Sequence, residues 1–220
     1  MTPNRTEPTL AETLRLIGDQ AQAAARRMVG LSTRRKNAVL DAMAEALEAR
    51  RDRIREANAR DLEAARAAGI PAALLDRLTL TEARIDALVR GVREVARLPD
   101  PVGRLIWRRT RPNGLRIEKR RVPLGVVAII YESRPNVTAD AAVLCIKTSN
   151  AVILRGGKEA LQSNLAIARA LQEGGERAGL PRHAVQLIET TDREAVRELV
   201  RLEDRVDLVI PRGGESLIRA

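Results

Sequence analysis

The chain has 220 residues, of which 45% are hydrophobic and 31% charged, the composition of a globular protein with a sizeable core. Its one cysteine and one histidine exclude an internal disulfide, a zinc cluster and a histidine-rich metal site within these residues, so no metal is expected and a reducing, cytoplasmic location is favoured. The formal net charge of +10 suits a nucleic-acid ligand, but one Trp, one Tyr and no Phe leave few platforms for base stacking.

Residues 1–103 are expected to form a helical N-terminal layer. Apolar residues recur at helical spacing over residues 10–28. A second helical pattern covers residues 32–71, and it either continues throughout or breaks and restarts within that range. A third helix is expected to begin at the segment Thr79–Glu82, whose T-x-x-E spacing is typical of a capping box. The prolines of LPDPVG end this helix at about residue 98.

Residues 104–122 are expected to form a basic β-hairpin, with RLIWRRT and LRIEKR flanking a turn at residues 111–114. Between Arg97 and Arg121 the sequence has nine basic and two acidic residues. A charged ribbon that faces water is the more ordinary interpretation, and a ligand role is less favoured. Because a long two-stranded ribbon is marginally stable alone, it is expected to lie against another subunit. The hairpin therefore predicts a homo-oligomer.

Residues 123–220 are expected to form a parallel α/β portion of the Rossmann-like kind. Continuous apolar runs alternate with amphipathic helices, a pattern typical of a parallel sheet covered on both faces. The expected strands are residues 125–131, 151–155, 184–188 and 206–210. The expected helices are residues 137–148, 158–172 and 192–201, the last with a capping box from Thr191 to Glu194. Ligands of such sheets bind outside the carboxyl ends of the strands.

Glycines and cations follow three of these strands. The tips are the segment YESRPNVT at residues 131–138, the run Arg155-Gly156-Gly157-Lys158, and the run Arg212-Gly213-Gly214. A single Arg-Gly-Gly is more typical of an ordinary turn with a surface arginine. Three such corners at one edge of a sheet favour a site for a phosphorylated ligand, because glycines allow close backbone approach and cations clamp phosphate.

The second strand tip predicts which coenzyme the site prefers. The fingerprint G-x-G-x-x-G is absent, and no acidic residue follows the second strand to accept a ribose 2′-hydroxyl. Arg155 and Lys158 stand there instead. Because cations suit a 2′-phosphate, NADP(H) is favoured over NAD.

The segments PLGVVAIIYESRPNVTADAAVLCIKTSNAVILRGGKEA and DLVIPRGG closely resemble the gamma-glutamyl phosphate reductase family of the aldehyde dehydrogenase superfamily. The likeness spans nearly the whole chain. It implies an aldehyde-dehydrogenase-like fold and the NADPH-dependent reduction of L-glutamyl 5-phosphate to L-glutamate 5-semialdehyde and phosphate, the second step of proline biosynthesis. It also implies a functional association with glutamate 5-kinase.

The resemblance further implies roles for particular residues. The segment ILRGGKEA corresponds to the part that holds the adenosine ribose, although Lys158 stands where a serine is expected. The segment IPRGG corresponds to the loop near the nicotinamide and pyrophosphate. Asn136, or Ser133 by a shifted alignment, falls at the position of a side-chain donor to the reaction's oxyanion. The hairpin corresponds to part of the oligomerisation arm.

The family's nucleophilic cysteine lies in a second domain, after the segment that IPRGG resembles. We therefore expect this chain to be the N-terminal part of the enzyme, with a parallel sheet incomplete at its C-terminus and no activity by itself. Cys145 lies among apolar residues in mid-helix, where burial makes a thiol inert, and His183 is expected at the surface. A non-catalytic coenzyme-binding fragment or pseudoenzyme is the alternative, and a basic nucleic-acid-binding protein is less favoured. No membrane partner is expected, because no apolar run reaches the ~18 residues of a span.

Overall fold

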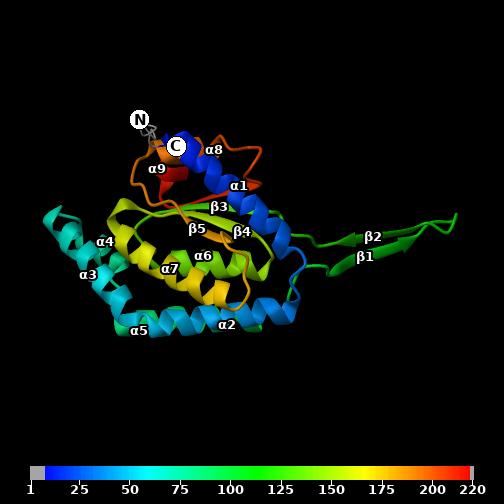
Figure 1. Cartoon of the computed structure of the whole chain (residues 1–220), viewed down its shortest axis with the longest axis horizontal. Coiled ribbons are helices and arrows are strands. Elements are labelled where there is room, and N and C mark those ends of the chain that lie inside the picture. Colours follow the sequence, from blue (N-terminus) through cyan, green and yellow to red (C-terminus); the bar gives the residue numbers. More distant parts are fainter. Residues whose placement is uncertain (1–7, 219–220) are drawn as a thin grey trace, which may run out of the picture.

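The computed structural model describes residues 8–218, which form an α/β fold with a projecting hairpin (Figure 1). The helices before the hairpin are α1 (Leu10–Met28), α2 (Thr33–Ala49), α3 (Arg51–Ala67), α4 (Ala72–Leu78) and α5 (Glu82–Arg97). The helices after it are α6 (Asn136–Lys147), the 3₁₀ turn η1 (Lys158–Ala160), α7 (Leu161–Arg177), α8 (Glu194–Val200) and α9 (Glu215–Ile218). None of the helices in the described part of the chain is both long and apolar enough to cross a bilayer.

The strands form two separate sheets. The hairpin pairs β1 (Leu105–Thr110) with β2 (Arg116–Arg120). The main sheet holds β3 (Val126–Tyr131), β4 (Ala151–Arg155), β5 (Val185–Leu187) and β6 (Leu208–Arg212) in the order β5-β4-β3-β6. All pairings in the main sheet are parallel. This confirms the predicted parallel βαβ sheet, and β3 lies at its centre because every residue of that strand is apolar or aromatic and buried.

Helices cover both faces of the sheet. Helix α1 packs against β3 and β4 on one face, with α8 beside it, and α6 and α7 pack against the other face. Helices α2, α3 and α5 form an outer layer that packs on α6 and α7 and is separated from the sheet by them (Figure 1). Residues from all of these layers belong to one continuous hydrophobic core. The N-terminal helices are thus built into the same core as the sheet.

Two predicted capping boxes are wrong. Thr79 follows α4, a short helix that the sequence analysis did not anticipate, and its hydroxyl donates to the carbonyl of Leu75 at 2.7 Å. The N-cap of α5 is Thr81 instead, whose hydroxyl accepts from the N–H of Arg84 at 3.2 Å. Thr191 likewise does not cap α8, which begins at Glu194.

Other boundaries shift by a few residues. The second helical pattern breaks at Arg50, where α2 ends and α3 begins. Residues 158–160 form a 3₁₀ turn, and α7 then continues to Arg177. The last strand covers residues 208–212 and not 206–210, because pairing with β3 begins where the N–H of Asp207 donates to the carbonyl of Val126 at 2.9 Å. Arg212 is therefore the last residue of β6.

Close packing of α7 on α2 depends on Gly174. A Cβ at this position would lie 2.5 Å from the carbonyl oxygen of Ala42 and 2.8 Å from the Cβ of Ala46. Helix propensity alone would make Gly174→Ala stabilising by about 1 kcal/mol, but overpacking against rigid backbone costs about 1–3 kcal/mol. We expect Gly174→Ala to lower the free energy of unfolding, measured in urea. Gly91→Ala in α5, where a Cβ meets nothing within 4 Å, should raise it. Equal stabilisation by both changes would contradict this packing.

Candidate functional site

The three glycine-containing or proline-containing corners lie at one edge of the sheet. Strand β3 is flanked by β4 and β6, with Ile130 opposite Arg155 and Tyr131 opposite Arg212. Because all three strands are parallel, their carboxyl ends emerge side by side. The predicted convergence of the strand tips is confirmed.

The glycines after β4 allow close contact with the segment after β3. A Cβ at Gly156 would lie 2.1 Å from Nδ2 of Asn164 and 3.0 Å from Cε2 of Tyr131. A Cβ at Gly157 would lie 3.2 Å from the carbonyl carbon of Glu132. These positions require glycine because two chain segments and a buried amide meet there.

The glycines after β6 lie against the carboxylate of Glu132. The N–H of Gly214 donates to Oε1 of Glu132 at 3.1 Å. A Cβ at Gly213 would lie 2.6 Å from the same carboxylate. This corner therefore already binds an anionic oxygen through a backbone N–H.

A cleft of about 360 Å³ opens at the tips of β3 and β6. Its lining includes Arg212, Gly213 and Gly214 from the β6 side, and Ser133 and Arg134 from the β3 side. The run from Arg155 to Lys158 lies at the neighbouring strand tip, outside the lining of this cleft. The structure thus brings the β3 and β6 residues together in one cleft, with the β4 corner directly behind residues 132 and 133.

Arg155 is held by backbone carbonyls. Its guanidinium donates to Gly156 at 3.0 Å, to Thr191 at 3.1 Å and to Asp192 at 3.3 Å. It therefore fixes the loop between β5 and α8 against the tip of β4. Lys158 is exposed one turn away, and of the two predicted cations it is the one that remains open to a ligand.

A buried polar chain lies beneath the Gly156 corner. The hydroxyls of Tyr131 and Thr138 are 2.6 Å apart, and Thr138 donates to Oδ1 of Asn164 at 2.9 Å. Burial raises the pKa of Tyr131, so the phenol stays neutral. Sequence reasoning quoted Tyr131 and Thr138 within a motif but missed Asn164. The sequence feature that could have identified Asn164 is its place as a polar residue on the buried face of α7.

Asn136, the first residue of α6, lies in a second cleft of about 420 Å³. Its Nδ2 donates to Oδ2 of Asp140 at 2.9 Å. Burial raises the pKa of Asp140, while the hydrogen bond from Asn136 and the charge of Arg212 act in the opposite direction. Arg77 and Arg134 line both clefts, which are therefore neighbours. The two residues predicted as alternatives for the oxyanion donor thus lie in adjacent clefts, Ser133 in the first and Asn136 in the second.

A model of the aldehyde dehydrogenase family matches residues 7–219. The chain belongs to the aldehyde dehydrogenase family. It is 56% identical to gamma-glutamyl phosphate reductase of Xanthomonas oryzae pv. oryzae over 207 residues, which are 94% of this chain and 50% of that protein. The crystal structure of gamma-glutamyl phosphate reductase from Thermotoga maritima aligns with a TM-score of 0.91 at 43% identity, over 94% of this chain and 50% of that one.

The crystal structure of a yeast relative also aligns with this chain. Gamma-glutamyl phosphate reductase from Saccharomyces cerevisiae aligns with a TM-score of 0.88 at 32% identity, over 97% of this chain and 53% of that one. The chain therefore spans about half the length of the relatives that it matches. These alignments confirm the predicted aldehyde-dehydrogenase-like fold.

Neither Cys145 nor His183 lies at the strand tips that form the two clefts. Cys145 lies within α6 with 7% of its surface exposed, and burial raises the pKa of its thiol to about 12. A thiol with this pKa is almost entirely protonated near neutral pH and is a poor nucleophile. His183 precedes β5, at the amino end of the sheet, opposite the two clefts.

Proposed function

We propose that this chain is the coenzyme-binding half of an NADPH-dependent reductase that converts L-glutamyl 5-phosphate to L-glutamate 5-semialdehyde and phosphate, in proline biosynthesis. The observation that supports this most strongly is 56% identity to a gamma-glutamyl phosphate reductase across 94% of the chain. The convergence of three strand tips at one sheet edge adds a physical reason, because open parallel sheets bind their ligands there.

The residues at these tips fit NADP(H). Lys158, with Arg155 behind it, supplies positive charge for a 2′-phosphate next to the Gly156–Gly157 corner, and Arg212 supplies it beside the Gly213–Gly214 corner. The N–H of Gly214 donates to the carboxylate of Glu132, which supports the binding of an anionic oxygen at this corner. When bound, the coenzyme supplies the hydride.

In the proposed chemistry, this chain binds the coenzyme and polarises the reacting carbonyl. In the net reaction, acyl phosphate, NADPH and a proton give aldehyde, NADP⁺ and phosphate. Cys145 is buried and its thiol is protonated, so it does not serve as the nucleophile. The thiolate that displaces phosphate and forms a thioester is therefore proposed to come from a cysteine outside these 220 residues. Ser133 or Asn136 donates a hydrogen bond to the oxyanion that develops on the reacting carbonyl.

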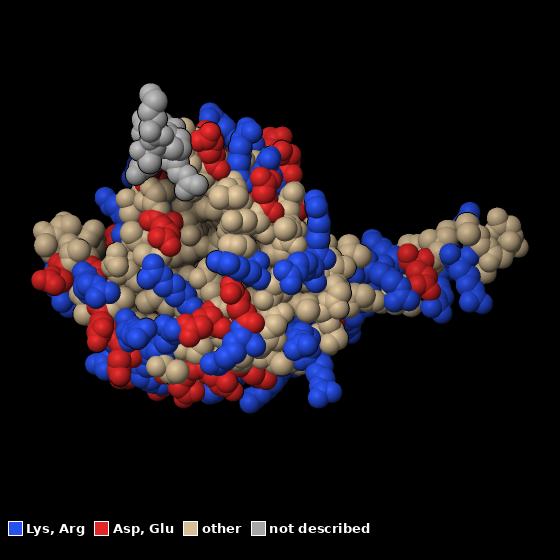
Figure 2. Space-filling model, in the orientation of Figure 1, with Lys and Arg blue, Asp and Glu red and all other residues tan. Residues whose placement is uncertain are grey.

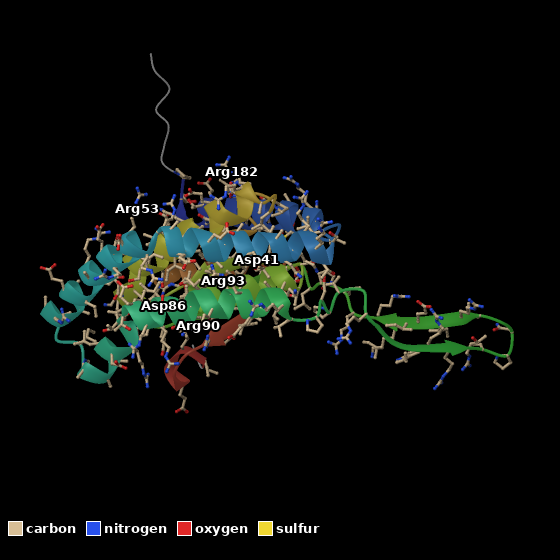
Figure 3. The ribbon with its side chains drawn as sticks, turned by 90° about the horizontal axis from the view of Figure 1, so that it is seen from below. Asp41, Arg53, Asp86, Arg90, Arg93 and Arg182 are labelled. Atoms are coloured by element: carbon tan, nitrogen blue, oxygen red, sulfur yellow. The ribbon has the colours of Figure 1, made fainter. Side chains whose placement is uncertain are left out.

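The coenzyme preference is tested at Lys158. We expect Lys158→Ala to weaken NADPH binding about tenfold, the loss of one charge-assisted hydrogen bond, and to leave NADH binding unchanged in a fluorescence titration. Arg53→Ala at an exposed position of α3 (Figure 3), away from the strand tips, is the control for loss of a surface cation. Arg155→Ala is less selective, because it also frees residues 191 and 192. Equal losses for NADPH and NADH with Lys158→Ala would refute a 2′-phosphate contact.

We also propose that the hairpin binds a second copy of the chain. It projects from the body with all residues of β1 and β2 exposed (Figures 1 and 2). The pairing of Arg109 with Ile117 places Ile117 on the same face as Trp107, whereas Arg108 and Glu118 form an ion pair on the other face. The same face also carries Arg109 and Lys119, so the exposed Trp107 and Ile117 lie among cations. We expect a second copy of the chain to cover these two apolar side chains.

The hairpin face that carries Trp107 and Ile117 predicts which substitution separates the subunits. We expect Trp107→Glu to lower the sedimentation coefficient to that of a smaller oligomer or monomer, since a buried aromatic anchor dominates such contacts. Thr110→Glu introduces the same charge on the opposite face and should leave the assembly intact. Identical sedimentation of wild type and Trp107→Glu would exclude this face from the interface.

A further inference from the structure

The second cleft carries both signs of charge. It lies between α4, the start of α5 and the start of α6, and its lining includes Arg77, Arg134, Asp140 and Asn136. Arg77 and Arg134 also line the first cleft, so the two clefts share a cationic wall. A ligand that extends from one cleft into the other passes this wall.

The arginines of this wall differ from their neighbour Arg84. Arg84 is held by the carboxylate of Asp76 at 2.9 Å and by the carbonyl of Thr79 at 2.9 Å. Over residues 8–218, the guanidinium groups of Arg77 and Arg134 have no hydrogen-bond or ion-pair partner. Two guanidinium groups that point at one cleft without a partner are suited to a carboxylate or a phosphate.

Asp140 supplies the opposite charge. Its Oδ2 accepts from Asn136, and within the described residues no donor reaches Oδ1. The side chain is half-buried, and this burial raises its pKa. A cation that enters the cleft would favour the ionised carboxylate, so an ammonium group is a suitable ligand for Oδ1.

We propose that this cleft recognises the α-amino-acid end of the substrate, with Arg77 and Arg134 binding the α-carboxylate and Asp140 binding the α-ammonium group. The inference rests on the proposed reductase function. The reacting carbonyl must lie near Ser133 or Asn136, at the junction of the clefts, and the glutamyl group carries a zwitterion at its other end. Only a site with both signs of charge binds such a zwitterion without leaving one charge unpaired.

Truncated substrates test each contact separately. In the complete reductase, activity is measured in the oxidative direction with inorganic phosphate, NADP⁺ and one of three aldehydes. L-Glutamate 5-semialdehyde has both charged groups, 4-aminobutanal lacks the carboxylate, and 5-oxopentanoate lacks the ammonium group. Wild type should prefer the first aldehyde over each of the others by about 10–100-fold in kcat/KM, the effect of a charge-assisted contact.

The variants should remove this preference selectively. Arg134→Gln and Arg77→Gln should raise KM for L-glutamate 5-semialdehyde about tenfold or more and leave KM for 4-aminobutanal, phosphate and NADP⁺ unchanged. Asp140→Asn should abolish the discrimination against 5-oxopentanoate. Arg90→Gln, on the outer face of α5 (Figure 3), is the control for loss of an exposed arginine.

The outcomes separate the two proposals. No phosphate-dependent reduction of NADP⁺ by wild type with any of the aldehydes would overturn the proposed function itself. An active wild type whose arginine variants lose activity equally with all three aldehydes, or lose phosphate affinity, would overturn the zwitterion site alone. Where Arg134→Gln lowers the melting temperature, Arg77→Gln on the separate helix α4 provides the same test.

Discussion

Replacing Asp100 with alanine is expected to lower the free energy of unfolding by about 3–5 kcal/mol, the cost of leaving a buried charge without its partner. Lys36 has 1% of its surface exposed, and its Nζ lies 2.6 Å from Oδ2 of Asp100. Lys147 is 2% exposed and lies close enough for Asp100 to raise its pKa against the larger effect of burial. Asp100 therefore pairs directly with one buried ammonium group and acts through its charge on a second.

Asp100 also joins the helical body to the hairpin. Its Oδ2 accepts from the hydroxyl of Thr33 at 2.8 Å and its Oδ1 accepts from the N–H of Val102 at 3.0 Å. The variant should therefore loosen the base of the hairpin as well as the core. Asp52→Ala in α3, where the carboxylate is 87% exposed, is the matched control and should change stability by less than about 0.5 kcal/mol.

The contribution of Asp100 to the free energy of unfolding should depend on pH. Burial acts to raise the pKa of Asp100, but hydrogen bonds from Lys36, Thr33 and the N–H of Val102 outweigh it and hold the pKa below its usual value. A carboxyl group with a depressed folded-state pKa stabilises the fold above its unfolded-state pKa of about 4, and this stabilisation is lost as the pH falls through the folded-state value. The free energies of unfolding of wild type and Asp100→Asn, measured in urea, should differ most near neutral pH and converge below about pH 4. A difference that does not change with pH would rule out the ion pair as its origin.

Sequence periodicity predicted the sheet because its strands are continuous apolar runs. Residues 126–131 and 151–155 contain almost only apolar side chains, and both are buried as predicted. Periodicity gives no sign of the burial of Lys36. This lysine stands in the basic run TRRKN, which favours a solvated surface, and only the fold brings Asp100 to it from beyond α5.

The candidate site shows the same division. The Arg-Gly-Gly corners could be predicted because both their composition and their place after strands are visible in the chain. The second cleft could not, because Arg77 comes from the unanticipated helix α4 and meets Arg134 and Asp140 only in three dimensions. Arg155 was predicted as a phosphate clamp, and sequence alone could not show that backbone carbonyls of residues 156, 191 and 192 already hold it.

Gly156→Ala is expected to reduce both stability and coenzyme affinity. The new Cβ would lie 2.1 Å from Nδ2 of Asn164, which cannot easily move because the residue is 1% exposed and its Oδ1 accepts from Thr138. Overpacking of this kind costs about 1–3 kcal/mol, and the displaced corner should bind NADPH at least about tenfold more weakly, since positioning errors of an ångström are costly. Gly30→Ala, where a Cβ meets nothing within 4 Å, is the control.

A double-mutant cycle with Asn164 identifies the cause. If the clash with Asn164 carries the effect, Gly156→Ala should cost less in an Asn164→Ala background, with a coupling energy of about 1–2 kcal/mol between the two changes in urea unfolding. Asn164→Ala alone leaves the hydrogen bond between Tyr131 and Thr138 in place. Additive effects would instead assign the loss to the backbone at the tip of β4. Unchanged NADPH affinity in a folded Gly156→Ala protein would remove this corner from the coenzyme site, because a ligand held against the glycine pair must respond when the clash with Asn164 displaces that backbone.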